Sequence, residues 1–174
     1  MTLTVINQPI IKGSLFLIVL LSCVFSSPAQ PPLPQRSLTV SEASQGIYFG
    51  TFCLSGSSGG TLTIGYDGSR SSTGDVLLLS KAPTAHPAVF NIKLCTGRNM
   101  SINFDSSTIL TGSNGGSFTL NLGPTEKGPN GSVFTTNNDC NFITPLRVGG
   151  TLHVPGLAIP GIYSGSFAIT FIQQ

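Results

Sequence analysis

Residues that could carry out catalysis are few and widely separated in this 174-residue sequence. Its two histidines are His86, which precedes Pro87, and His153, which lies between Leu152 and Val154. A protein metal site normally needs three or four ligands, and two isolated histidines do not supply them. We therefore predict no catalytic residue, no metal site, no cofactor and no enzymatic activity. A hydrolase with a Ser-His-Asp triad remains an alternative, because the members of a triad can be distant in sequence.

The segment from Asp67 to Asp75 offers oxygen atoms that a calcium ion could bind. It begins Asp67-Gly68-Ser69 but lacks the alternating acidic residues of an EF-hand loop. The same three residues are typical of a tight turn, because glycine accepts positive φ and aspartate bonds to nearby backbone. We predict that residues 67–74 form a loop at the tip of a hairpin.

Residues 1–29 are typical of a secretory signal peptide. Lys12 supplies positive charge, and an apolar run extends from Leu15 to Phe25. A helix over this run would be only about 16 Å long, which is too short to cross a bilayer core of about 30 Å. Small residues follow the run, so we predict cleavage after Ala29 and no membrane span in the mature chain.

A different maturation is suggested by Leu20-Leu21-Ser22-Cys23, which resembles a bacterial lipobox. In that interpretation Cys23 carries a lipid and becomes the mature N-terminus, which would anchor the protein to a membrane. Both interpretations predict export.

Three further cysteines, Cys53, Cys95 and Cys140, follow the predicted signal peptide. Export would place them in an oxidising compartment, where disulfides form and persist. Each possible pair would stabilise the fold by about 4 kcal/mol through chain entropy, so energetics does not select a pair. The alternative is three reduced, buried thiols that act as small apolar side chains.

The amino-acid composition limits the kind of fold and surface that can position the residues named above. Only 8% of the residues are charged, against about 25% in an average soluble domain, and the net charge is +2. The scattered basic residues do not form the patch that nucleic-acid binding needs. Glycine, serine, threonine and asparagine are abundant, so solvated surfaces must be built mainly from uncharged side chains. Such surfaces suit packing beside neighbours at a cell surface, with little long-range repulsion.

Alternation of apolar and polar residues indicates many short β-strands, most clearly at Ala88–Leu94, Ser117–Leu122 and Tyr163–Phe171. Two adjacent glycines within the Leu146–Val154 strand indicate a bulge or a close backbone approach. Further strands are expected at Leu38–Val40, Ile47–Leu54, Thr61–Tyr66, Val76–Leu79, Met100–Phe104, Thr108–Leu110 and Val133–Phe134. We predict a Pro-rich lead-in over residues 30–37 and an all-β, antiparallel β-sandwich over residues 38–174.

Several segments taken together resemble the bacterial domain-of-unknown-function 4402 family. They are Tyr48–Phe52, Gly59–Ile64, Ala88–Ile92 and Val148–Val154 followed by Pro160–Thr170, with Arg70–Gly74 fitting the intervening loop. The resemblance covers residues 38–171. It implies a secreted, surface-associated, pilin-like protein of a Gram-negative bacterium, with an immunoglobulin-like sandwich and no established catalytic residues.

The segment Phe90–Cys95 also resembles the second-cysteine strand of chaperone–usher pilins. This resemblance implies a disulfide between Cys53 and Cys95, and it assigns no role to Cys140.

We therefore expect an exported structural or adhesive protein, extracellular or on the outer cell surface, which could be a fimbria-like subunit contacting itself or another surface protein. Polymerisation by a donated N-terminal strand is not favoured, because the segment before Leu38 is rich in prolines, which lack a backbone N–H. The alternative is a binding module for a glycan or a protein, with a lipid anchor at Cys23 if that residue is modified.

Overall fold

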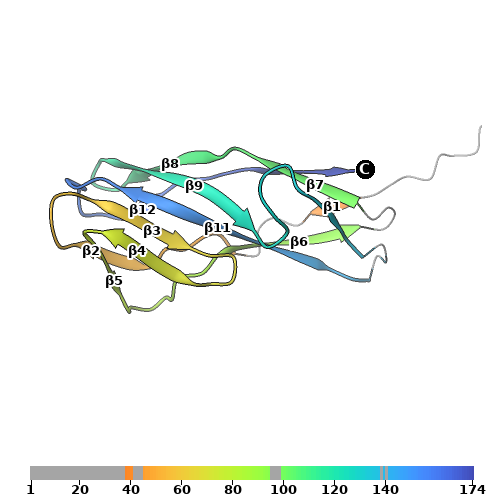
Figure 1. Ribbon diagram of the computed structural model, residues 1–174, viewed down its shortest axis with the longest axis horizontal. Helices are drawn as coiled ribbons and strands as arrows, with labels where there is room; N and C mark the ends of the chain where they lie inside the picture. Colours follow the sequence, from red (N-terminus) through yellow and green to blue (C-terminus); the bar gives the residue numbers. More distant parts are fainter. Residues whose placement is uncertain (1–37, 41–44, 95–98, 138, 140) are drawn as a thin grey trace, which may run out of the picture. The chain divides into compact units, whose positions relative to one another are not determined.

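The computed structural model describes residues 38–40, 45–94, 99–137, 139 and 141–174. These residues form thirteen strands and no helix (Figure 1). None of them therefore belongs to a helix that is long and apolar enough to cross a membrane. The predicted signal peptide, the Pro-rich lead-in and Cys23 lie outside the described residues.

The largest sheet has eight strands and is organised around β11 (Thr144–Val154). The first half of β11 pairs with β6 (Ala88–Leu94), and its second half pairs with β3 (Gly60–Ile64). On its other side β11 pairs with β9 (Ser117–Thr125). The outer strands are β1 (Leu38–Val40) beside β6, β4 (Arg70–Gly74) beside β3, β8 (Ser107–Gly112) beside β9, and β12 (Tyr163–Ser164) beside β8.

Two smaller sheets complete the domain. One contains β10 (Val133–Thr135), β7 (Asn99–Phe104) and β13 (Ile169–Gln173), and the other contains β2 (Thr51–Leu54) and β5 (Val76–Leu79). All pairings between these strands, like those of the large sheet, are antiparallel.

A single apolar core lies between the sheets. Phe90 on β6 meets the rings of Phe167 and Phe171 edge-on, with ring centroids 6.2 Å apart in both pairs. The ring centroid of Phe52 on β2 lies 6.2 Å from that of Phe118 on β9. The fully buried side chains come from both layers and include Leu62, Ile64, Ile92, Leu94, Met100, Ile102, Leu146 and Val148. The predicted all-β, antiparallel sandwich is confirmed, and the arrangement is consistent with an immunoglobulin-like fold.

The predicted single strand over Tyr163–Phe171 is wrong, because the structure divides it into β12 and β13. β12 pairs with β8 in the large sheet, whereas β13 pairs with β7 in the three-stranded sheet. Gly165 lies at the break, where an added Cβ would be 2.7 Å from the carbonyl oxygen of Ile109. The hydroxyl of Thr108 holds the crossing segment by donating to the carbonyl oxygen of Ser166 at 2.9 Å. Strands that bend from one sheet into the other commonly form the corners of β-sandwiches.

Several other strand boundaries differ from those predicted, and two of the differences have a clear physical cause. The strand expected over Ile47–Leu54 begins only at Thr51, because Gly50 has a φ of +74° that interrupts the extended backbone. The expected loop over residues 67–74 ends at Ser69, and Arg70–Gly74 forms β4. Side chains on both faces of β4 are polar, so the segment lacks the apolar alternation that marks a strand in the sequence.

The glycine pair in β11 marks a close backbone approach, as predicted. A Cβ at Gly149 would collide with the carbonyl oxygen of Ile64, and a Cβ at Gly150 would lie 2.9 Å from Cδ1 of Leu120. The pairing of β11 with β9 shifts register between Val148 and Gly150. β11 can therefore pass close to both neighbouring strands only because these two positions lack side chains.

Candidate functional site

The solvated face of the large sheet carries an ordered array of uncharged side chains on β4, β3, β11, β9 and β8. Strand pairing aligns these side chains in two rows across the five strands, and we call the array the hydroxyl face. The first row is Ser71, Thr63, Thr151, Asn121 and Ser107, and the second is Thr73, Thr61, His153, Thr119 and Ile109. No Asp, Glu, Lys or Arg occurs in either row.

Hydrogen bonds between neighbouring strands order this face. The hydroxyls of Thr61 and Thr73 lie 2.7 Å apart, and those of Thr63 and Thr151 lie 3.0 Å apart. Adjacent strands are separated by about 4.8 Å, so directly opposite threonines reach one another without distortion. Threonine is also stiff at χ1, because its Cβ is branched. The hydroxyl groups of these four threonines are therefore fixed before any partner arrives.

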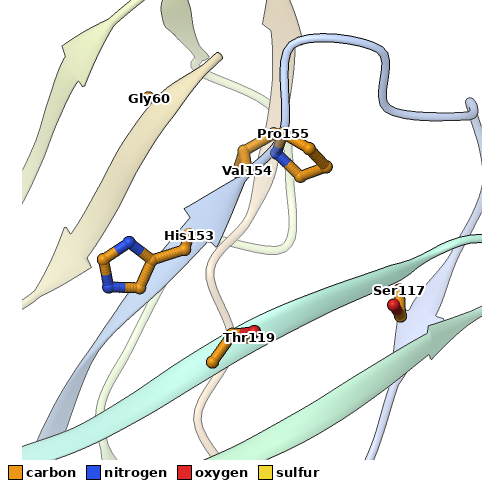
Figure 2. A pocket seen from close by; sticks show the side chains of 6 residues that line it. All are labelled: Gly60, Ser117, Thr119, His153, Val154 and Pro155. Atoms are coloured by element: carbon orange, nitrogen blue, oxygen red, sulfur yellow. The ribbon is translucent and has the colours of Figure 1, made fainter.

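An open hollow with a volume of about 330 Å³ lies beside His153 and Thr119, in the middle of the second row (Figure 2). It is lined by Gly60, Ser117, Thr119, His153, Val154 and Pro155. The backbone of β4 passes close to Gly60, because a Cβ at Gly60 would collide with the carbonyl oxygen of Thr73. The hollow thus combines one imidazole, two hydroxyl groups and the apolar atoms of Val154 and Pro155.

His153 is held in place by the strand next to it. Its Nε2 lies 3.0 Å from the amide nitrogen of Asn121 on β9. In this arrangement the amide donates to a neutral imidazole, which leaves Nδ1 to carry the ring proton. The face is uncharged in that tautomer, and His153 offers the hollow one further donor.

Three charged side chains gather beside the other half of β11. Arg147 donates to a carboxylate oxygen of Glu126 at 3.0 Å, and Lys127 lies 4.0 Å from the other oxygen. Arg147 precedes the glycine pair of β11, whereas Thr151 and His153 follow it. The charges therefore occupy one end of the strand and the hydroxyl face the other.

The two histidines take part in separate local arrangements. His86 exchanges backbone hydrogen bonds of 2.9 Å with Tyr48, and the two rings lie 5.8 Å apart. His153 belongs to the hydroxyl face on β11. Within the described part of the chain, no group of three or more His, Cys, Asp and Glu side chains could hold a metal ion.

The predicted hairpin tip at Asp67 is confirmed. A carboxylate oxygen of Asp67 accepts hydrogen bonds from the Ser69 hydroxyl at 2.6 Å and the Ser69 backbone N–H at 3.0 Å. Both hydrogen bonds lower the pKa of Asp67, and the bond from the Ser69 hydroxyl has the larger effect. Asp75 lies beyond the far end of β4 and accepts from the N–H of Ser58 at 2.7 Å. The two aspartates therefore do not converge on one calcium site.

The segment between β2 and β3 carries a pattern that is typical of a catalytic serine in another fold. Gly56-Ser57-Ser58-Gly59-Gly60 matches G-x-S-x-G, which in α/β-hydrolases marks a nucleophilic serine between a strand and a helix. Here the pattern lies between β2 of the two-stranded sheet and β3 of the large sheet. The backbone N–H of Ser58 donates a hydrogen bond to the Asp75 carboxylate. The strand–turn–helix context that gives the pattern its meaning does not occur at this position.

Cys53 lies on the outer side of β2, where it is exposed and carries a free thiol. It is paired across the strands with Leu77 of β5, whose side chain is 51% exposed. Cys95 and Cys140 lie outside the described residues. The disulfide between Cys53 and Cys95 thus stays a prediction.

The sequence predicted that the solvated surfaces are built mainly from uncharged side chains, but it did not predict the hydroxyl face itself. Its signal in the sequence is alternation of small polar residues, as in Thr61-Leu62-Thr63 and Ser71-Ser72-Thr73. Alternation reveals which residues share a side of one strand. It does not reveal that five strands align these residues into two continuous rows.

Comparison with known proteins places the chain in a family. A family model described as a domain of unknown function (DUF4402) matches residues 38–172. No curated protein and no solved structure matches the chain. The matched range contains all ten residues of the hydroxyl face and the residues that line the hollow. Because the match spans well over half of the sequence, the chain belongs to the family of the domain of unknown function DUF4402.

Proposed function

We propose that this protein is an exported, non-enzymatic adhesive or structural protein of the cell surface, and that it contacts its target through the hydroxyl face. The observation that carries the proposal is the ordering of ten side chains without Asp, Glu, Lys or Arg on five paired strands. Covering a charged side chain removes its water, which opposes binding unless a partner charge compensates. The hydroxyl face avoids that penalty across its whole width.

The chemistry of this face favours a neutral, polar target. Its hydroxyl groups and the amide of Asn121 both donate and accept hydrogen bonds. The groups lie on a sheet with regular spacing along and across the strands, so an extended partner could bond at several points. An uncharged polysaccharide or the uncharged side of another surface protein has this character. A nucleic acid does not, because its backbone is recognised mainly by basic residues.

A second candidate function, a glycan-binding module, is favoured by the hollow beside His153. Its volume of about 330 Å³ falls at the lower end of the range for small-molecule sites, about 300 to 1,000 Å³. Sugar hydroxyls could bond to Ser117, Thr119 and the ring of His153, while Pro155 and Val154 contact the carbon face. In this function the hollow receives one sugar unit of a chain that lies along the hydroxyl face.

The test compares charge substitutions on the two outer faces of the sandwich. The exported chain is assayed for binding to producing cells and to an array of neutral and acidic glycans. Thr119→Lys and Ser71→Lys, on the hydroxyl face, should each weaken binding at least tenfold. Thr170→Lys is the matched control, because Thr170 is also an exposed strand residue but belongs to β13.

Two results would count against the proposal. Unchanged binding by both hydroxyl-face variants would remove this face from the contact, and an equal loss in the Thr170→Lys control would show a nonspecific charge effect. His153→Ala separates the two candidate functions. It should abolish binding to arrayed glycans if the hollow is a sugar site, and it should leave cell binding nearly unchanged if a protein target covers the whole face.

A further inference from the structure

The loop that follows β11 presents apolar side chains to solvent. We call residues 155–162 the apical loop. Leu157 is 87% exposed and Ile162 is 79% exposed, the two highest values among the large apolar residues of the described chain. Isolated exposed apolar residues are ordinary, but two such residues in one loop of eight residues offer apolar area that a partner can bury, and we call the pair a patch.

The backbone of the apical loop is fixed by the hairpin between β8 and β9. The Asn114 amide donates to the carbonyl oxygen of Pro160 at 2.7 Å. Ser113 and Ile162 exchange two hydrogen bonds, one from the Ser113 N–H to the Ile162 carbonyl at 2.8 Å and one from the Ile162 N–H to the Ser113 hydroxyl at 3.1 Å. These bonds hold the C-terminal half of the loop against residues 113–114 before a partner binds.

Tyr163 and Gly156 hold the two ends of the apical loop. The Tyr163 hydroxyl donates to the carbonyl oxygen of Ile159 at 2.6 Å, and its ring stacks on Phe118 with centroids 3.6 Å apart. At the other end, a Cβ at Gly156 would collide with the carbonyl oxygen of Ser57. An apolar side chain on a preorganised loop loses less conformational entropy on binding than one on a flexible loop, which favours contact with a partner.

A second exposed apolar pair lies at the opposite end of the same strand. Phe142 and Ile143 immediately precede β11 and are 55% and 57% exposed. β11 has 11 residues, so the two patches are separated along it by roughly 35 Å at about 3.3 Å per residue. One molecule therefore presents an apolar patch at each end of its longest strand.

The geometry points to a head-to-tail contact between copies of this chain, in which the apical loop of one copy packs on Phe142 and Ile143 of the next. A two-fold contact of apical loops would leave Phe142 and Ile143 in solvent, whereas a head-to-tail contact covers both patches. The apical loop contains no charged residue, and the receiving end adds Asp139, which accepts a hydrogen bond from the Asn141 N–H at 2.9 Å. Like charges therefore do not oppose the contact.

A contact between unlike patches at opposite ends does not close on itself, so it produces linear assemblies. This inference rests on the proposed structural role at the cell surface, and it names the partner as a second copy. It depends on residues outside the hydroxyl face. Loss of adhesion and loss of assembly can consequently be measured separately.

Sedimentation of the exported chain over a wide concentration range tests the inference. Wild-type protein should form a series of species beyond the dimer as concentration rises. The double variant Leu157→Ser/Ile162→Ser should remain monomeric, and so should Phe142→Ser/Ile143→Ser. Leu77→Ser is the control, because Leu77 is 51% exposed but lies on β5, and it should assemble like wild type.

Mixing the two double variants gives the decisive result. Each variant retains one intact patch, and the two intact patches are complementary. The mixture should therefore form a 1:1 dimer and nothing larger, although each variant alone is monomeric. Three outcomes would overturn the inference: a wild-type chain that stays monomeric at all concentrations, a Phe142→Ser/Ile143→Ser variant that still dimerises alone, or a mixture that contains only monomers. Near-ultraviolet circular dichroism of each variant checks that its fold is intact.

Discussion

Nη2 of Arg70 lies 2.8 Å from the carbonyl oxygen of Thr51, and Nη1 of the same side chain lies 3.1 Å from the carbonyl oxygen of Leu79. Thr51 and Leu79 are opposite each other in the pairing of β2 with β5. One side chain from β4 thus connects the large sheet to the end of the two-stranded sheet. Gly50 leaves space for it, because a Cβ there would lie 3.2 Å from Nη2.

Replacing Arg70 should therefore destabilise the domain. Arg70→Met keeps most of the apolar stem but removes both hydrogen bonds, and we expect a loss of about 2 kcal/mol in the free energy of unfolding. Urea denaturation measures the change. The control is Arg147→Met, which removes an exposed ion pair with Glu126 and should change stability by less than about 1 kcal/mol. Equal losses in the two variants would contradict a connecting role for Arg70.

Gly149 should not tolerate even one additional carbon atom. Gly149→Ala places a Cβ against the carbonyl oxygen of Ile64 on the neighbouring strand. Relief requires a shift of backbone, so we expect destabilisation of about 1 to 3 kcal/mol, measured by thermal unfolding. Gly46→Ala serves for comparison, because nothing lies within 4 Å of a Cβ at that position. A wild-type midpoint for Gly149→Ala would show that β11 does not approach β3 this closely.

The turn at Asp67 should contribute to stability in a pH-dependent way. The hydroxyl of Ser69 is the largest cause of the lowered pKa of Asp67, so Ser69→Ala should raise that pKa toward its ordinary value. A pKa that is lower in the folded state stabilises the protein above the unfolded-state pKa, and this stabilisation is lost as the pH falls through the folded-state pKa.

The stability difference between wild type and Ser69→Ala should consequently disappear in acid. Carboxyl chemical shifts followed by NMR give the pKa of Asp67, and Ser117→Ala, on β9, supplies the control. An Asp67 titration that is identical in wild type and Ser69→Ala would rule out the hydrogen bond as the cause.

The exposed thiol of Cys53 should react in the folded protein. We expect iodoacetamide to label Cys53 without prior reduction, because its side chain is exposed and free on the outer side of β2. Mass spectrometry of the digested protein identifies the labelled cysteine, and Cys53→Ser provides the unlabelled reference. Labelling that appears only after reduction would support the disulfide with Cys95 that the pilin resemblance implies.

Local alternation predicted the strands whose two sides differ in polarity. The bounds of β5 and β6 were predicted correctly, since Val76–Leu79 is an apolar run and Ala88–Leu94 alternates clearly. β4 was missed because serine, threonine and arginine occupy both of its sides. The division of the last strand was missed for a different reason: alternation reports the side on which a residue lies, but not the sheet to which its strand belongs.

The site was predictable only in its composition. Scarcity of charge predicted uncharged solvated surfaces, and the structure contains one. The alignment of His153 with Thr61 and Thr119 depends on pairing between segments that are far apart in the sequence. The sequence also did not predict the two exposed apolar patches, one in the apical loop and one at Phe142 and Ile143. Apolar residues beside a strand suggest core packing until their exposure is known.

The corner at Gly165 has a mechanical consequence. The segments β7–β8 and β12–β13 run together as a ribbon that belongs to the three-stranded sheet at one end and to the large sheet at the other. Tension applied to the C-terminus would first strip β13 from β7, then reach the corner and load β12 against β8. Because the same two segments cross from one sheet to the other, the two layers cannot separate unless the pairing of β12 with β8 or of β13 with β7 is broken.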